Sequence, residues 1–130
     1  MTRLIVDTSA YSALMRGHDG VMAALREAGS IAVNPIILGE LRAGFLRGVH
    51  RRKNEGELRR FLASARVFVV AIDEETAERY AVIVDSLRAA GTPIPTNDVW
   101  IAASAMQHGL GVLTTVRHFH RIPQVAVEPA

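Results

Sequence analysis

The stretch Leu4-Ile5-Val6-Asp7-Thr8-Ser9 decides the fold class of this chain. Its three apolar residues end at an acid and two hydroxyl residues, which is typical of a buried parallel strand that leads into a helix. Later apolar runs predict strands over residues 31–33, 67–72, 112–114 and 125–127. Helical patterns fill the intervals, over residues 8–15, 19–28, 35–46, 50–64, 73–90 and about 96–108. This alternation predicts a single α/β domain over residues 1–130, with a parallel sheet of four to five strands covered by helices on both faces.

The length and composition exclude several classes of protein. A chain of 130 residues is enough for one domain and too short for two ordinary ones. The absence of cysteine excludes cysteine catalysis, disulfide frameworks and cysteine-ligated zinc. No apolar stretch approaches the roughly 20 residues of a membrane span, and the first residues lack the apolar run of a secretory signal. We therefore expect a soluble, cytoplasmic protein that does not bind membranes.

Basic residues are concentrated in one part of the chain. The net charge of the whole sequence is only +2, but residues 42–66 carry eight basic and two acidic groups. A local positive stretch on a nearly balanced protein indicates contact with a polyanion or an acidic partner. A solvated helical face is the alternative interpretation.

Two acids occupy positions that suit a functional site. Asp7 follows an apolar strand, and ligands of open α/β sheets bind beyond the carboxyl ends of such strands. The alternative is that Asp7 only caps the following helix. Asp98 shares a helical stripe with Ile101, Ala102 and Ala105, which is the face expected to pack on the sheet. A favourable place in the first turn of that helix would explain the position of Asp98 but not its inward direction.

Glu40 is a third candidate. At 3.6 residues per turn it lies roughly 100° from the centre of the apolar face of its helix, and therefore on the rim. Gly39 and Gly44 lie close to it and allow close approach, although each costs roughly 1 kcal/mol in a helix relative to alanine. An ordinary solvated glutamate is the alternative.

The three acids together indicate a metal site if they converge. Each carboxylate raises the cost of ionising the others, and a cation removes that conflict. Ligands that are all oxygen suit a hard ion such as Mg²⁺ or Mn²⁺. Such an ion activates water near neutral pH and stabilises charge on a phosphate, so hydrolysis of phosphodiester bonds fits these residues.

Four motifs in series resemble one known family. They are Leu4 to Ser9, Gly39-Glu40-Leu41, Asn97-Asp98-Val99-Trp100-Ile101-Ala102-Ala103, and Gly109-Leu110 followed by Leu113-Thr114 and His118-Phe119-His120-Arg121-Ile122-Pro123. Their order and spacing resemble the PIN domain, and specifically VapC-type toxins of toxin–antitoxin pairs, across nearly the whole chain. The resemblance implies a PIN-like fold and an endoribonuclease that depends on Mg²⁺ or Mn²⁺. It also implies a homodimer, neutralised by a small antitoxin whose tail lies across the active cleft.

The resemblance assigns roles to the three acids. Asp7, Glu40 and Asp98 match the family's first, second and third metal-binding acids and are the expected catalytic residues. Many relatives place a fourth acid where this chain has Val116, which holds neither metal nor water. Three readings stay open: three acids suffice with a single ion, a neighbour such as His118 substitutes, or activity is diminished. Diminished activity would make the chain a catalytically weakened PIN-like module that binds RNA or protein.

Affinity for RNA is expected to come from the basic stretch. Phosphate contacts supply most of the sequence-independent affinity of proteins for nucleic acids, and they make it fall with salt. The expected RNA-binding residues are Arg42, Arg47, Arg51, Arg52 and Lys53. The same side chains could instead face an acidic segment of the antitoxin.

Other polar residues favour structural roles. Thr8 and Ser9 match the small hydroxyl residues that follow the first acid in the family. They either support a ligand or cap the helix, and capping is the favoured role. His18, His50, His108 and His120 show no zinc-binding spacing, so we expect surface or packing positions for these four. For His118, a place in a helix turn is favoured over a role as a ligand. Asp7-Thr8-Ser9 also lacks the second acid of a dehalogenase-type phosphatase, and no phosphate-cradling glycine loop with a lysine is present.

Overall fold

The computed structural model describes residues 2–130, which form a five-stranded, entirely parallel sheet in the order β3-β2-β1-β4-β5. The strands are β1 (Arg3–Val6), β2 (Ser30–Val33), β3 (Val67–Val69), β4 (Gly111–Leu113) and β5 (Val127–Glu128). The predicted α/β class is therefore confirmed. Two predicted strands were placed imperfectly, because β3 ends at Val69 rather than residue 72 and β5 begins at Val127 rather than residue 125. The strand β3 stops there because its partner β2 ends at Val33, which pairs with Val69.

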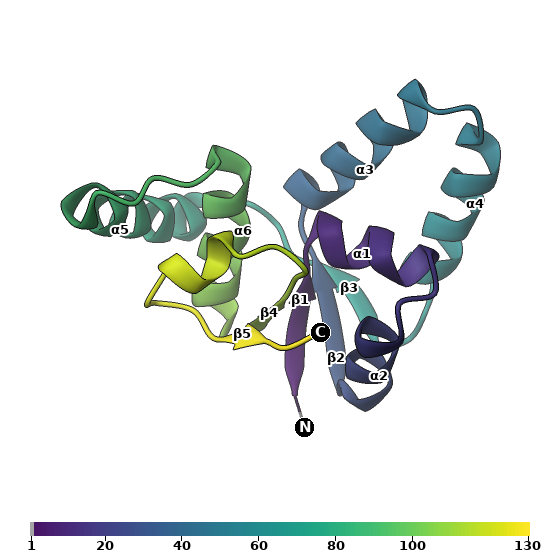
Figure 1. Cartoon of the computed structure of the whole chain (residues 1–130), viewed down its shortest axis with the longest axis horizontal. Helices are drawn as coiled ribbons and strands as arrows, with labels where there is room; N and C mark the ends of the chain where they lie inside the picture. Colours follow the sequence, from purple (N-terminus) through teal and green to yellow (C-terminus); the bar gives the residue numbers. More distant parts are fainter. Residues whose placement is uncertain (1) are drawn as a thin grey trace.

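Helices cover both faces of the sheet. Figure 1 shows α1 to α4 on one side of it and α5 and α6 on the other. This division follows from the strand order, because right-handed crossovers in opposite directions along a sheet place their helices on opposite faces. The bounds are α1 (Thr8–Met15), α2 (Asp19–Glu27), α3 (Pro35–Arg47), α4 (Arg51–Leu62), α5 (Glu74–Ala90) and α6 (Thr96–His108), followed by the 3₁₀ turn η1 (His118–Arg121). None of the helices described in residues 2–130 combines the length and the apolar character that crossing a bilayer requires.

The strand order reverses at β1, in the centre of the sheet: β2 and β3 are added on one side of it, and β4 and β5 on the other. Strand β1 is fully buried from Leu4 to Val6 and pairs with β2 on one side and β4 on the other. Ligands of open parallel sheets bind beyond the carboxyl ends of strands at such a point. Buried polar residues follow all three strands there: Asp7 after β1, Asn34 after β2 and Thr114 after β4.

Asn34 fixes the position of α3 relative to α6. Its Oδ1 accepts a hydrogen bond from the backbone N–H of Ile37 at 3.0 Å, which caps α3. Its Nδ2 donates to Oγ of Ser104 on α6, also at 3.0 Å. Both partners are buried, so this amide ties together the two helices that carry Glu40 and Asp98.

Candidate active site

Asp7 is both a helix cap and a site residue. Its Oδ1 accepts from the backbone N–H of Ala10 at 2.8 Å and from Oγ of Ser9 at 2.7 Å. Its Oδ2 accepts from Oγ1 of Thr114 at 2.6 Å, across the junction of β1 and β4. Capping a helix and occupying a functional site are thus compatible roles for Asp7. The same carboxylate caps α1 and lies at the carboxyl edge of the sheet.

Burial raises the pKa of Asp7, which is only 2% exposed. The hydrogen bonds from Thr114, Ala10 and Ser9 favour the ionised form and oppose this rise, while the nearby charge of Asp98 adds to it. Hydrogen bonds therefore hold the Asp7 carboxylate in place, while burial makes its ionised form less favourable. A cation bound beside it would relieve that cost.

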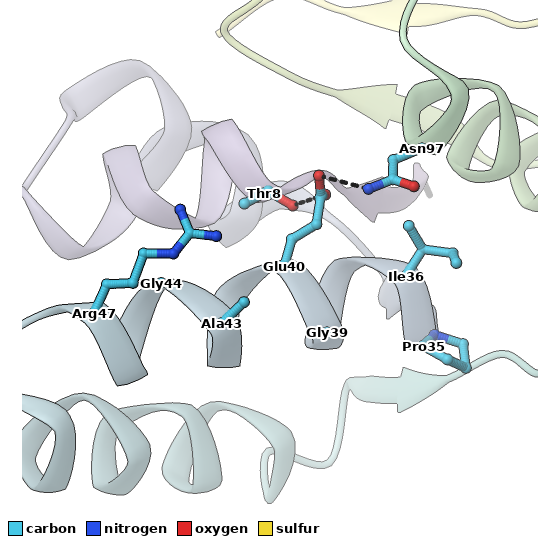
Figure 2. Close-up of a pocket in the computed structure, with 9 residues that line it drawn as sticks. All are labelled: Thr8, Pro35, Ile36, Gly39, Glu40, Ala43, Gly44, Arg47 and Asn97. Carbon is cyan, nitrogen blue, oxygen red and sulfur yellow. Dashed lines mark hydrogen bonds between the residues drawn. The ribbon is translucent and has the colours of Figure 1, made fainter.

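Glu40 connects the neighbours of the other two acids. Its Oε1 accepts from Oγ1 of Thr8 at 2.5 Å, and its Oε2 accepts from Nδ2 of Asn97 at 3.2 Å. Figure 2 shows the carboxylate between these two side chains, which come from α1 and α6. Thr8 therefore supports a candidate ligand rather than capping a helix, so the capping role expected for it is wrong.

Asp98 lies in the first turn of α6 and is paired with a histidine. Its Oδ2 is 2.6 Å from Nδ1 of His118 in η1. His118 lies in the 3₁₀ turn η1, as expected for a turn histidine, and it also contacts a candidate ligand. Sequence spacing gave no zinc pattern that could have identified it, because its partner is 20 residues away on another element.

The structure brings the three acids to one edge of the sheet. Asp98 lies near enough to Asp7 for its charge to raise the pKa of Asp7. Glu40 is bonded to Thr8, which follows Asp7, and to Asn97, which precedes Asp98. The three acids thus lie at the same edge of the sheet and are linked through shared neighbours, while their roles as metal ligands and catalytic residues stay predictions.

The chemistry of this donor set fits a hard divalent cation. All three side chains offer oxygen atoms, and none of the ion pairs found within residues 2–130 joins a lysine or arginine to Asp7, Glu40 or Asp98. In the part of the chain described, no three acidic or histidine side chains form a ready-made ion cluster. Each carboxylate is instead bonded to a protein donor: the hydroxyls of Ser9 and Thr114, the hydroxyl of Thr8 with the amide of Asn97, and the imidazole of His118.

A cavity of about 630 Å³ opens beside Glu40 along α3. An added Cβ at Gly39 or Gly44 would meet nothing within 4 Å, so packing does not require glycine at either position. Glycine at these positions therefore carries its cost in a helix without a packing reason, and the two glycines add no side chain to the cavity wall. Its lining residues are Thr8, Pro35, Ile36, Gly39, Glu40, Ala43, Gly44, Arg47 and Asn97 (Figure 2).

The five basic residues predicted to bind RNA do not all line the cavity beside Glu40. Only Arg47 lines the cavity beside Glu40. Arg42 is exposed and paired with Glu55 on α4 at 2.9 Å. Arg51 and Arg52 line a second cavity, of about 470 Å³, while Lys53 is exposed and lines neither.

Sequence reasoning gave no site role to Asn97 or Thr114, and it favoured helix capping over ligand support for Ser9. Asn97 and Ser9 are adjacent or nearly adjacent in sequence to Asp98 and Asp7, so proximity to a candidate acid was the available signal. Thr114 had a signal of a different kind, because it follows the strand β4 at the same edge of the sheet. Val116 stands where many relatives have a fourth acid. It is half-buried and packs against the hydrophobic core, so in this chain it has a packing role.

Comparison with known proteins agrees with this geometry. The family model of the PIN domain matches residues 4–125. The chain is 37% identical over 95 residues to Ribonuclease VapC4 of Mycobacterium tuberculosis, covering 73% of each protein. It is 34% identical over 130 residues to Ribonuclease VapC1 of Rickettsia felis, covering 95% of this chain and 93% of that protein. A crystal structure of DNA-bound VapBC from Salmonella typhimurium superimposes with a TM-score of 0.85 at 25% identity, over 98% of each chain. The chain belongs to the PIN domain family and is a relative of its VapC ribonucleases.

Proposed function

We propose that this protein is an endoribonuclease toxin of the VapC type that depends on Mg²⁺ or Mn²⁺. The observation that carries the proposal is the placement of Asp7, Glu40 and Asp98 at the carboxyl edge of the sheet, where Glu40 bonds to the residues next to both aspartates. The naming of the relatives as ribonucleases supports the reaction class.

The three carboxylates would hold the ion. When bound, such an ion activates water near neutral pH and neutralises negative charge that gathers on a phosphate. The protein's own contribution is orientation. Ser9 and Thr114 fix both oxygens of Asp7, and Thr8 and Asn97 fix both oxygens of Glu40. Because these hydrogen bonds join α1, α3, α6 and the residue that follows β4, rigid elements hold the carboxylates in place.

The cavity along α3 supports an RNA strand as the substrate. Its smooth wall at Gly39, Ala43 and Gly44 leaves room for a sugar–phosphate backbone beside Glu40. Arg47 lies about two helical turns beyond Glu40, on the same side of α3, as Figure 2 shows. Its forked guanidinium group suits a phosphate next to the one that is cleaved.

A metal titration tests this function. The protein is treated with EDTA, dialysed, and mixed with a pool of single-stranded and hairpin RNAs of mixed sequence. We expect no cleavage without a divalent ion, and cleavage after Mg²⁺ or Mn²⁺ is added. Cleavage that persists unchanged in EDTA would contradict the metal-dependent mechanism. Binding of RNA without cleavage under any divalent ion would support the weakened binding module instead.

Arg47 is expected to contribute more to RNA binding than the other basic residues. In an Asp98→Asn background, which permits equilibrium binding, Arg47→Gln should weaken RNA affinity about 10-fold at low salt. It should also reduce the slope of log K against log salt by roughly one, as the loss of one phosphate contact does. Lys53→Gln is the matched control, because Lys53 is exposed and lines neither cavity. Fluorescence anisotropy at four salt concentrations measures both variants, and equal effects would refute the special position of Arg47.

A small antitoxin is the proposed protein partner. The chain resembles VapC-type toxins, and a VapBC crystal structure shares its fold. A basic stretch over residues 42–66 suits an acidic segment of such a partner. The expected homodimer also stays a prediction.

A further inference from the structure

We infer that His118 positions the carboxylate of Asp98 for the divalent cation, and so supplies a contact in the region where this chain lacks the family's fourth acid. This inference rests on the proposed function. Its basis is the separation of 2.6 Å between Nδ1 of His118 and Oδ2 of Asp98, which is short for a hydrogen bond and typical of one to an ionised group.

The turn that carries His118 is firmly anchored. Phe119, the next residue, is fully buried, and Ile122 just beyond the turn is 2% exposed. The backbone N–H of Ile122 closes the turn on the carbonyl of Phe119 at 3.1 Å. His118 is thus held against Asp98 by the packing of its neighbours. Arg117 and His120 in the same segment are exposed.

The contact also connects two parts of the site. Thr114, at the end of β4, donates to Asp7, and the same segment four residues later brings His118 to Asp98. Val116, between them, packs against the core and contributes no polar group. One continuous stretch therefore holds both aspartates through a hydroxyl and an imidazole, although it contributes no carboxylate of its own.

The imidazole fixes how the carboxylate is turned. With a proton on Nδ1, the ring donates to Oδ2 of Asp98. Within residues 2–130, no side-chain hydrogen bond was found to Oδ1 of Asp98, so that oxygen keeps its lone pairs for a cation. Hydrogen-bonding partners of metal ligands reduce the rotational freedom that the ligand loses on binding, and their removal typically weakens metal affinity about 10–100-fold.

Direct binding of Mn²⁺ tests the inference without relying on activity. The signal of free Mn²⁺ in electron paramagnetic resonance gives the dissociation constant for the unsubstituted protein and for three variants. We expect His118→Ala to weaken Mn²⁺ binding about 10-fold. We expect His118→Asn to recover most of the lost affinity, because its side-chain amide offers a donor close to the position of Nδ1. His120→Ala is the matched control, since His120 is exposed in the same turn, and should leave the affinity unchanged.

Thermal unfolding separates positioning from folding. His118 has a side chain that is 39% exposed, so all three variants should unfold within a few degrees of the unsubstituted protein. Saturating Mn²⁺ should also restore RNA cleavage by His118→Ala, because the defect lies in ion affinity. Mn²⁺ affinity that is unchanged or higher in His118→Ala would overturn the role of His118 and leave the proposed function intact. Failure of the unsubstituted protein to bind Mn²⁺ would instead overturn the metal-dependent function, and this inference with it.

Discussion

Replacing Asp98 by asparagine is expected to lower the rate of RNA cleavage by about 100-fold or more. The substitution removes a negative charge from the proposed ion site, and this loss should exceed the roughly 10–100-fold effect of removing a partner of a metal ligand. Asparagine keeps an oxygen that accepts from His118, so the contact between α6 and η1 should survive. The measurement is the initial rate of RNA cleavage at saturating Mg²⁺, with the unfolding temperature recorded for each protein.

Asp85→Asn is the matched control for this experiment. Asp85 is an exposed acid on α5, so the control changes the net charge equally without touching the site. We expect it to cleave RNA at the unsubstituted rate. An Asp98→Asn variant that cleaves at that rate as well would remove Asp98 from the mechanism.

Replacing Asp7 by asparagine is expected to abolish cleavage while making the metal-free protein more stable near neutral pH. Burial raises the pKa of Asp7, so between the unfolded value of 3.8 and the higher folded value the folded chain holds more protons than the unfolded chain. Stability contributed by this group therefore falls as the pH rises through that window. Asparagine removes the cost of the buried charge, and a gain of about 0.5–2 kcal/mol is typical when a strained active-site group is replaced.

The pH dependence of unfolding by urea in EDTA measures this effect. The stability difference between Asp7→Asn and the unsubstituted protein should be small below about pH 4 and should grow toward pH 7. Addition of Mg²⁺ should stabilise the unsubstituted protein and not the variant, because binding to the folded state alone raises stability. A variant that is less stable than the unsubstituted protein at pH 7 in EDTA would contradict the assignment of Asp7 as a destabilised anion.

Asp73→Asn is the matched control, because Asp73 caps α5 as Asp7 caps α1. Hydrogen bonds from the backbone N–H of Thr76 and from Gln107 lower the pKa of Asp73 instead of raising it. A group with a lowered pKa contributes stability above the unfolded value and loses it as the pH falls through the folded value. The control should therefore lower stability at pH 7, which is opposite in sign to the effect at Asp7.

Local patterns were sufficient for most of the fold. The run from Leu4 to Val6 predicted a buried strand, and Asn34 with Pro35 marked the start of α3 where the structure has it. The ends of β3 and β5 were harder to predict. A strand ends where its neighbour in the sheet ends, and that neighbour is distant in sequence. Apolar composition indicates which residues form strands but not how far each pairing extends.

The sequence by itself determined the α/β class and the order of the elements, and it indicated three candidate acids, because hydrophobic periodicity and charged residues in apolar settings are local properties. Only the tertiary structure decided which side chains support those acids. The bonds from Thr8 to Glu40 and from His118 to Asp98 join residues 32 and 20 positions apart. The tertiary structure also decided which of the five basic residues predicted to bind RNA lines the cavity beside Glu40, namely Arg47. The physical reason is that a side chain's partner across two packed elements depends on where those elements dock, and docking is set by the whole core rather than by neighbouring residues.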